Sequence, residues 1–121
     1  MRRGSWHIKS EGQTLTLSRG LRARLDVAAS TSLPDAGRTK IAHQVRQDLW
    51  RALQGLKGFS PVIKVRREAG QLHVIAGGEV SGHIARDHVE CVIQGVLDNP
   101  EKRTRWLNYA RHKSSKLADR T

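Results

Sequence analysis

Hydrophobic and polar residues alternate along the first part of the chain, as they do in β-strands with one buried face. Trp6 and Ile8 alternate with polar neighbours, and Leu15 and Leu17 alternate with threonine and serine. A third alternating run covers residues 21–27. Turns that contain glycine separate the three runs, so the pattern predicts an antiparallel meander of three strands with one face in water.

The longest regular pattern follows a polar connector at residues 29–33 and has a helical period. Its apolar positions recur every three or four residues and are Ile41, Val45, Leu49, Leu53 and Leu56. Ser32 or Asp35 is expected to cap the start of this amphipathic helix, with Pro34 in its first turn. Gly58 is expected to end it in a left-handed conformation.

The second half of the chain predicts a hairpin followed by a helix. Residues 61–68 and 71–76 alternate on either side of a tight turn at 69–70. A brief further strand is expected at residues 79–81. The period then becomes helical again over residues 85–97.

Asn99 and Pro100 indicate the start of a last helix, because asparagine caps a helix well and proline fits its first turn. Trp106, Leu107 and Ala110 form the apolar side of this helix. The complete order is β-β-β-α-β-β-α-α. It predicts an α+β fold in which an antiparallel sheet packs on one face against two or three helices.

We expect one α+β domain over residues 6–112, with a flexible basic arm at 1–5 and a flexible basic tail at 113–121. A chain of 121 residues has room for one such domain. No apolar run is long enough to span a membrane, no secretory signal follows the first residues, and the single cysteine cannot form an internal disulfide. These features predict a cytoplasmic protein with no membrane partner.

The charge of the chain is its most informative functional feature. The sequence holds 22 Lys and Arg against 11 Asp and Glu, a formal net charge of +11, and fifteen of the basic residues are arginine. Arginine presents a planar fork of donors that suits phosphate oxygens. We therefore predict a small non-catalytic module that contacts nucleic acid, DNA or RNA, through an arginine-rich surface.

The predicted contacts gather on the third strand, on the central hairpin, and on the last helix with its tail. The candidate residues are Arg22, Arg24, Lys64, Arg66, Arg67, Lys102, Arg103, Arg105, Arg111 and Lys113. Trp6 and Tyr109 are candidates for base stacking, whereas Trp50 and Trp106 are expected in the core or at its edge. The alternatives are an accessory or inhibitor protein that docks on an acidic protein partner, a homo-oligomer, and a basic surface that only maintains solubility.

His83, His88 and Cys91 lie close together near the start of the second predicted helix and suggest a different chemistry. A zinc site needs three or four ligands, and the remaining histidines show no ligand spacing. Cys91 lies beside Val92, against the apolar stripe, where a free cysteine is usually inert. The sequence contains no phosphate-binding loop and no paired carboxylates. We predict that the protein is not an enzyme and uses no metal or cofactor.

Overall fold

The structure is a computed structural model that describes residues 6–19, 23–81 and 85–111. Its elements are β1 (His7–Glu11), β2 (Thr14–Ser18), β3 (Val27–Pro34), α1 (Arg38–Ala52), β4 (Ser60–Glu68), β5 (Gln71–Glu79), α2 (Arg86–Asp98) and α3 (Pro100–Ala110). The five strands form one antiparallel sheet with the order β1-β2-β4-β5-β3. The predicted α+β class and the predicted order of elements are confirmed.

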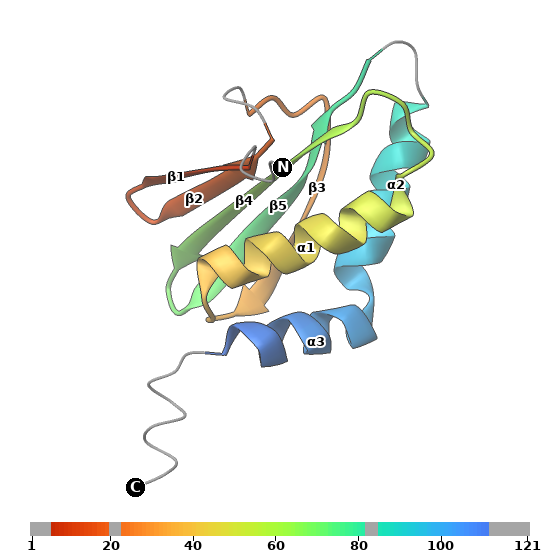
Figure 1. Cartoon of the computed structure of the whole chain (residues 1–121). Helices are drawn as coiled ribbons and strands as arrows, with labels where there is room; N and C mark the ends of the chain where they lie inside the picture. The colour runs from red at the N-terminus through yellow and green to blue at the C-terminus, as the bar shows by residue number, and fades with distance from the viewer. Residues whose placement is uncertain (1–5, 20–22, 82–84, 112–121) are drawn as a thin grey trace, which may run out of the picture.

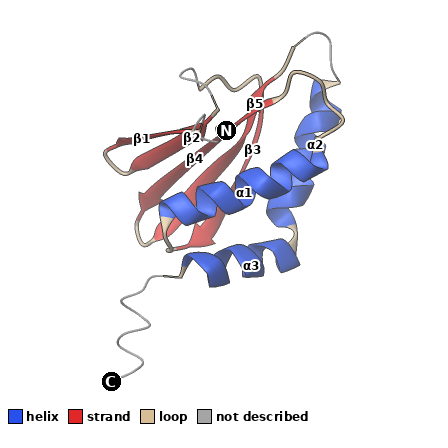
Figure 2. Cartoon of the chain, viewed as in Figure 1, coloured by secondary structure: helices blue, strands red, loops and turns tan. Residues whose placement is uncertain are grey.

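The helices form a second layer against the sheet, as Figure 1 and Figure 2 show. Helix α1 lies across β4 and also contacts β2 and β5. Helix α2 packs against β3, and α3 packs against both α1 and α2. Two helices therefore cover the sheet directly, and the third is held by the other two.

The buried face of the sheet consists of cross-strand rows of aliphatic side chains. The register brings together buried residues of β2, β4 and β5, namely Leu15, Leu17, Ile63, Val65, Val74 and Ala76. The apolar stripes of α1 and α2 close the core over these rows with Ile41, Val45, Leu49, Val89, Ile93 and Leu97. The helical and alternating patterns of the sequence therefore supply the core. Each buried Leu, Ile or Val in it stabilises the fold by about 1.5–3 kcal/mol.

The third strand differs from the prediction in both its position and its neighbour. The run predicted at residues 21–27 ends where β3 begins, and the connector predicted at residues 29–33 lies inside β3. Residues 21 and 22 fall outside the described part of the chain. β3 pairs with β5 at the far edge of the sheet, so the predicted meander is wrong. Val27 and Leu33 are buried and anchor the two ends of a strand whose small residues resemble a loop in sequence.

β3 and β5 approach each other closely at Gly77. A Cβ atom on this residue would collide with the carbonyl oxygen of Val27, so the pairing requires glycine at this position. Because the pairing continues past Gly77, β5 runs without a break through Glu79. The separate strand predicted at residues 79–81 is therefore wrong.

The start of α1 depends on the backbone instead of a side-chain cap. Gly37 is its N-cap residue and makes no side-chain hydrogen bond, so neither Ser32 nor Asp35 caps the helix. The N–H of Gly37 donates to the carbonyl oxygen of Ala110 at 2.8 Å. This hydrogen bond ties the start of α1 to the end of α3.

The remaining helix ends follow their sequence signals to different degrees. α1 ends at Ala52, so the end predicted at Gly58 is wrong by more than a helical turn. α3 begins as predicted. The side chain of Asn99 accepts a hydrogen bond from the N–H of Lys102 at 2.9 Å, and Pro100 occupies the first turn.

Candidate functional site

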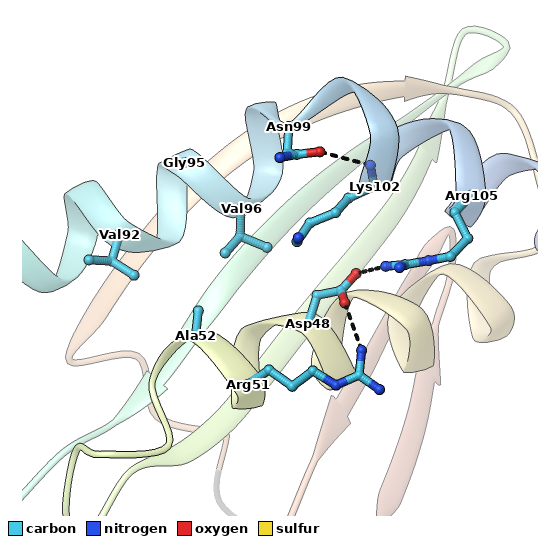
Figure 3. Close-up of a pocket in the computed structure, with 9 residues that line it drawn as sticks. All are labelled: Asp48, Arg51, Ala52, Val92, Gly95, Val96, Asn99, Lys102 and Arg105. Carbon is cyan, nitrogen blue, oxygen red and sulfur yellow. Dashed lines mark hydrogen bonds and ion pairs between the residues drawn. The ribbon is translucent and has the colours of Figure 1, made fainter.

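A cavity of about 390 Å³ lies where the three helices meet. Val92 and Val96 of α2 give it an apolar side. Its charged residues come from the other two helices and are Asp48, Arg51, Lys102 and Arg105. Figure 3 shows the three basic side chains arranged around Asp48, so a single carboxylate lies among three cations.

Asp48 is a buried carboxylate that joins α1 to α3. Its side chain is only 3% exposed. Its Oδ2 accepts hydrogen bonds from the indole Nε1 of Trp106 at 2.7 Å and from the Arg105 guanidinium. The Arg51 guanidinium donates to the other oxygen, Oδ1, at 3.4 Å. A buried charge is tolerated only when it is paired and hydrogen-bonded, and these three donors meet that requirement.

The two arginines that pair with Asp48 remain largely in solvent. Arg51 is 64% exposed and Arg105 is 50% exposed. Lys102 is partly exposed and forms no ion pair with any carboxylate in the described part of the chain. The carboxylate therefore fixes the inner ends of two guanidinium groups and leaves a surplus of positive charge outside.

This basic surface continues along α1 and α3 beyond the cavity. The Lys40 ammonium lies 5.6 Å from the centroid of the Tyr109 ring, and Tyr109 is 57% exposed. We call the surface formed by Lys40, Arg51, Lys102, Arg105 and Tyr109 the α1–α3 seam. The two helices together contain seven Lys and Arg and only two carboxylates, of which Asp48 is buried.

The sequence prediction identified only part of the seam. It included Lys102, Arg105 and Tyr109 on the last helix but none of the α1 residues. Asp48 was missed, although it follows Val45 by three residues and so falls on the apolar stripe of α1. An acidic residue on a buried stripe, and the only one in that helix, is the signal that would have indicated a buried charge with cationic partners.

Arg103 faces away from the seam. Its guanidinium donates to the hydroxyl of Thr31 at 2.8 Å, to the carbonyl oxygen of Leu97 at 2.9 Å and to the carbonyl oxygen of Ser32 at 2.7 Å. These acceptors belong to β3 and to the end of α2. The structure therefore separates Arg103 from Arg105, although the sequence placed both on one candidate surface.

The three basic residues of the central hairpin are divided between the two faces of the sheet. Arg67 points to the helix side, where its guanidinium pairs with Asp35 at 2.7 Å and donates to the carbonyl oxygen of Ala36 at 2.9 Å. Lys64 and Arg66 lie on the opposite face, where they line a hollow of about 410 Å³. Arg66 is paired with Glu68 at 2.9 Å, which reduces the net charge of this face.

The remaining predicted residues lie apart from the seam or outside the described chain. Arg24 is paired with Asp26 at 3.0 Å and with Glu79 at 3.7 Å. The N–H of Val80 and then Arg24 stabilise the Asp26 carboxylate and lower its pKa. Arg111, next to the end of α3, donates to the side chain of Asn108 at 3.2 Å. Arg22 and Lys113 are not among the described residues.

Trp6 is packed against basic residues on the other flank of α1. The guanidinium carbons of Arg19 and Arg46 lie 5.0 and 4.5 Å from the centroid of its ring. Partial burial and the nearby Arg46 lower the pKa of His43 on the same helix. Trp6 is therefore already in contact with cations of the protein, and of the two predicted stacking residues Tyr109 is the more exposed.

Trp106 is fully buried, as predicted, but Trp50 is 53% exposed. Cys91 is also exposed, so its expected place on the apolar stripe is wrong. His83 lies outside the described residues. Over residues 6–19, 23–81 and 85–111, no group of three His, Cys, Asp or Glu side chains could hold a metal ion. None of the helices in these ranges combines the length and the hydropathy that a membrane span requires.

Comparisons of the chain with protein-family models, with curated proteins and with solved structures find no match.

Proposed function

We propose that the protein is a non-catalytic nucleic-acid-binding module and that the α1–α3 seam contacts the phosphate backbone. One observation carries the proposal: Arg51, Lys102 and Arg105 surround one cavity, and among the residues that the structure describes the only carboxylate lining it is the buried Asp48. Basic side chains on this surface would neutralise phosphates of a polyanion and release the counterions that were bound there.

The arrangement of Asp48 makes the seam better suited to phosphate than a scattered set of basic residues. Its oxygens hold the guanidinium groups of Arg51 and Arg105 by their inner donors, which reduces the conformational entropy that these side chains lose on binding. The outer donors of each planar fork stay in solvent and can form paired hydrogen bonds with phosphate oxygens. Lys102 adds a third charge with no carboxylate partner in the described chain.

Tyr109 gives the seam an aromatic ring beside its charges. The ring is 57% exposed and lies next to Lys40. Exposed aromatic rings next to basic residues stack on unpaired bases and contribute about 1–3 kcal/mol per base. The seam therefore favours single-stranded nucleic acid over duplex.

The proposal is tested by fluorescence anisotropy with labelled oligonucleotides of equal length, single-stranded and duplex, over a series of salt concentrations. We expect affinity to fall with salt, with a slope of about 0.7–0.9 per phosphate contact. Two double variants remove the same charge from different surfaces. They are Arg51→Gln with Lys102→Gln on the seam, and Lys64→Gln with Arg66→Gln on the open face of the sheet.

The seam variant is expected to bind about tenfold more weakly and to lose about two contacts from the salt slope, while the sheet variant changes less. An equal loss in both variants would mean that net charge alone drives binding and would overturn the seam as the site. Absence of binding by the wild type at the lowest salt would overturn the function itself.

A second candidate function is docking of an acidic protein partner, and the exposure of Trp50 on α1 favours it. Tryptophan is enriched in protein interfaces, and Trp50 is exposed. Because Trp50 is not one of the seam residues, it can be changed without altering the charges of the seam. Trp50→Ala separates the two functions. We expect this variant to keep its affinity for oligonucleotides, and a loss as large as that of the seam variant would contradict the assignment of binding to the seam.

A further inference from the structure

We propose that β1 pairs with β1 of a second copy of this chain, so that two sheets join edge to edge. The proposal is independent of nucleic-acid binding. It rests on the difference between the two edge strands, β1 and β3, and on the order of charges along β1. Unpaired edges of antiparallel sheets present free N–H and C=O groups that pair with another strand unless they are covered.

The outer edge of β3 is covered by side chains of α2 and α3. The N–H of Ala28 donates to Oε2 of Glu90 at 2.9 Å, and the amide of Gln94 donates to the carbonyl oxygen of Ser30 at 3.1 Å. The Arg103 guanidinium donates to the carbonyl oxygen of Ser32 at 2.7 Å. Three alternate residues of β3 therefore have an outward backbone group bound within the molecule, and no second strand can pair with this edge without displacing them.

The pleat identifies the residues of β1 that point outward. The N–H of Arg67 donates to the carbonyl oxygen of Gln13 at 3.0 Å, so odd-numbered residues at the β2 edge direct their backbone groups to β4. Even-numbered residues of β2 then face β1, where their register partners are His7, Lys9 and Glu11. The alternate residues of β1, Ile8 and Ser10, are left with their backbone groups directed away from the sheet.

The edge formed by Ile8 and Ser10 is open in the described part of the chain. No described side chain is hydrogen-bonded to it, and all five residues of β1 are exposed. Figure 1 shows β1 as the outermost strand, on the side of the sheet opposite α2. Ile8 is an apolar side chain that is 48% exposed on this strand.

The charges of β1 fit a second copy in one antiparallel register. Lys9 and Glu11 lie on the same face of the sheet, two residues apart, and contact each other at 3.4 Å. A twofold axis through the Ser10 pair would place each Lys9 opposite Glu11 of the other copy. These would be non-hydrogen-bonded pairs, in which side chains approach most closely. A register centred on Lys9 would instead oppose two lysines.

Analytical ultracentrifugation over a wide range of protein concentrations tests the pairing. We expect a reversible dimer for the wild type. Lys9→Glu replaces two attractive cross-strand pairs by two repulsive ones and should weaken association by about tenfold. The double variant Lys9→Glu with Glu11→Lys restores opposite charges in the Ser10-centred register, so it should dimerise like the wild type.

Ser10→Pro provides a second test, because it removes an outward N–H and leaves the bonds between β1 and β2 in place. We expect this variant to be a monomer with an unchanged circular dichroism spectrum. A wild type that stays monomeric at every concentration would overturn the proposal. A double charge reversal that fails to restore the dimer would overturn the register.

Discussion

Arg103 and Arg105 lie two residues apart on α3, and their guanidinium groups serve two different regions of the molecule. Arg103 is turned toward β3, where it donates to two carbonyl oxygens and a hydroxyl. Arg105 is turned toward α1, where it shares the Asp48 carboxylate with Arg51 and Trp106 and remains half exposed. A cluster of arginines in a sequence is therefore not yet a binding surface.

The difference between the two regions lies in their acceptors. In the β3 region Arg103 donates to neutral groups, and one of them, the carbonyl oxygen of Ser32, belongs to the outer edge of the sheet, so this arginine is part of the fold. In the α1–α3 seam, one buried carboxylate orients cations that keep donors in solvent. Variants of the two regions should therefore separate stability from binding.

The largest effect is expected from Asp48→Ala. This change leaves the Nε1 of the buried Trp106 without an acceptor and removes the shared partner of two arginines, so the free energy of unfolding should fall by about 3 kcal/mol. Urea denaturation measures the loss. Asp48→Asn keeps an acceptor and should lose less. An alanine variant as stable as the wild type would show that Asp48 does not hold α3 on α1.

Arg103→Lys tests the other region with the charge unchanged. Lysine cannot reproduce a fork that reaches Thr31, Leu97 and Ser32 together, so we expect a loss of about 2 kcal/mol in unfolding free energy. Oligonucleotide affinity at low salt should stay within about twofold of the wild type, because the charge is kept. A large loss of affinity in a folded Arg103→Lys protein would place this residue on the binding surface.

Arg105→Gln is expected to show the opposite balance. Asp48 would still be bonded by Trp106 and Arg51, and Arg105 is half exposed, so the loss of stability should be below about 1 kcal/mol. Affinity for an oligonucleotide should fall several-fold, and the salt slope should decrease by about one contact. Denaturation and anisotropy on the same preparation measure both. A larger loss of stability in Arg105→Gln than in Arg103→Lys would contradict the assignment of Arg103 to the fold and of Arg105 to binding.

The sequence predicted the elements that have a strong period or a specific cap. The stripe of Ile41, Val45 and Leu49 identified α1, and Asn99 with Pro100 located the start of α3. It did not predict β3, because the segment between Val27 and Leu33 contains only alanine, serine and threonine. Such residues become a strand through pairing with β5, which no local pattern reveals.

The candidate site was predicted only in part for a related reason. Charge and helical spacing indicated Lys102 and Arg105, but not which face of α3 would meet α1. That choice depends on the buried Trp106 and on Asp48, which are far apart in the sequence and in contact in the fold. The alternation of β4 does place Arg66 and Arg67, which are adjacent in sequence, on opposite faces of the sheet, but the charge pattern alone grouped both on one contact surface.

The smallest effect concerns pH and a third cluster, on the flank of α1 that faces Trp6. Burial, and then the charge of Arg46, lower the pKa of His43 below its ordinary value of 6.5. The unfolded chain therefore binds a proton at His43 more readily than the folded chain does. The stability tied to the neutral imidazole is present above pH 6.5 and is lost as the pH falls through the lower pKa of the folded state. His43→Gln should flatten this part of the stability–pH curve in urea denaturation.

Because no seam residue is a histidine, the affinity of the folded fraction for an oligonucleotide should be the same in His43→Gln and wild type across that range. A pH dependence of binding that is lost in His43→Gln would show that both flanks of α1 take part in binding and would contradict the assignment of binding to the seam alone.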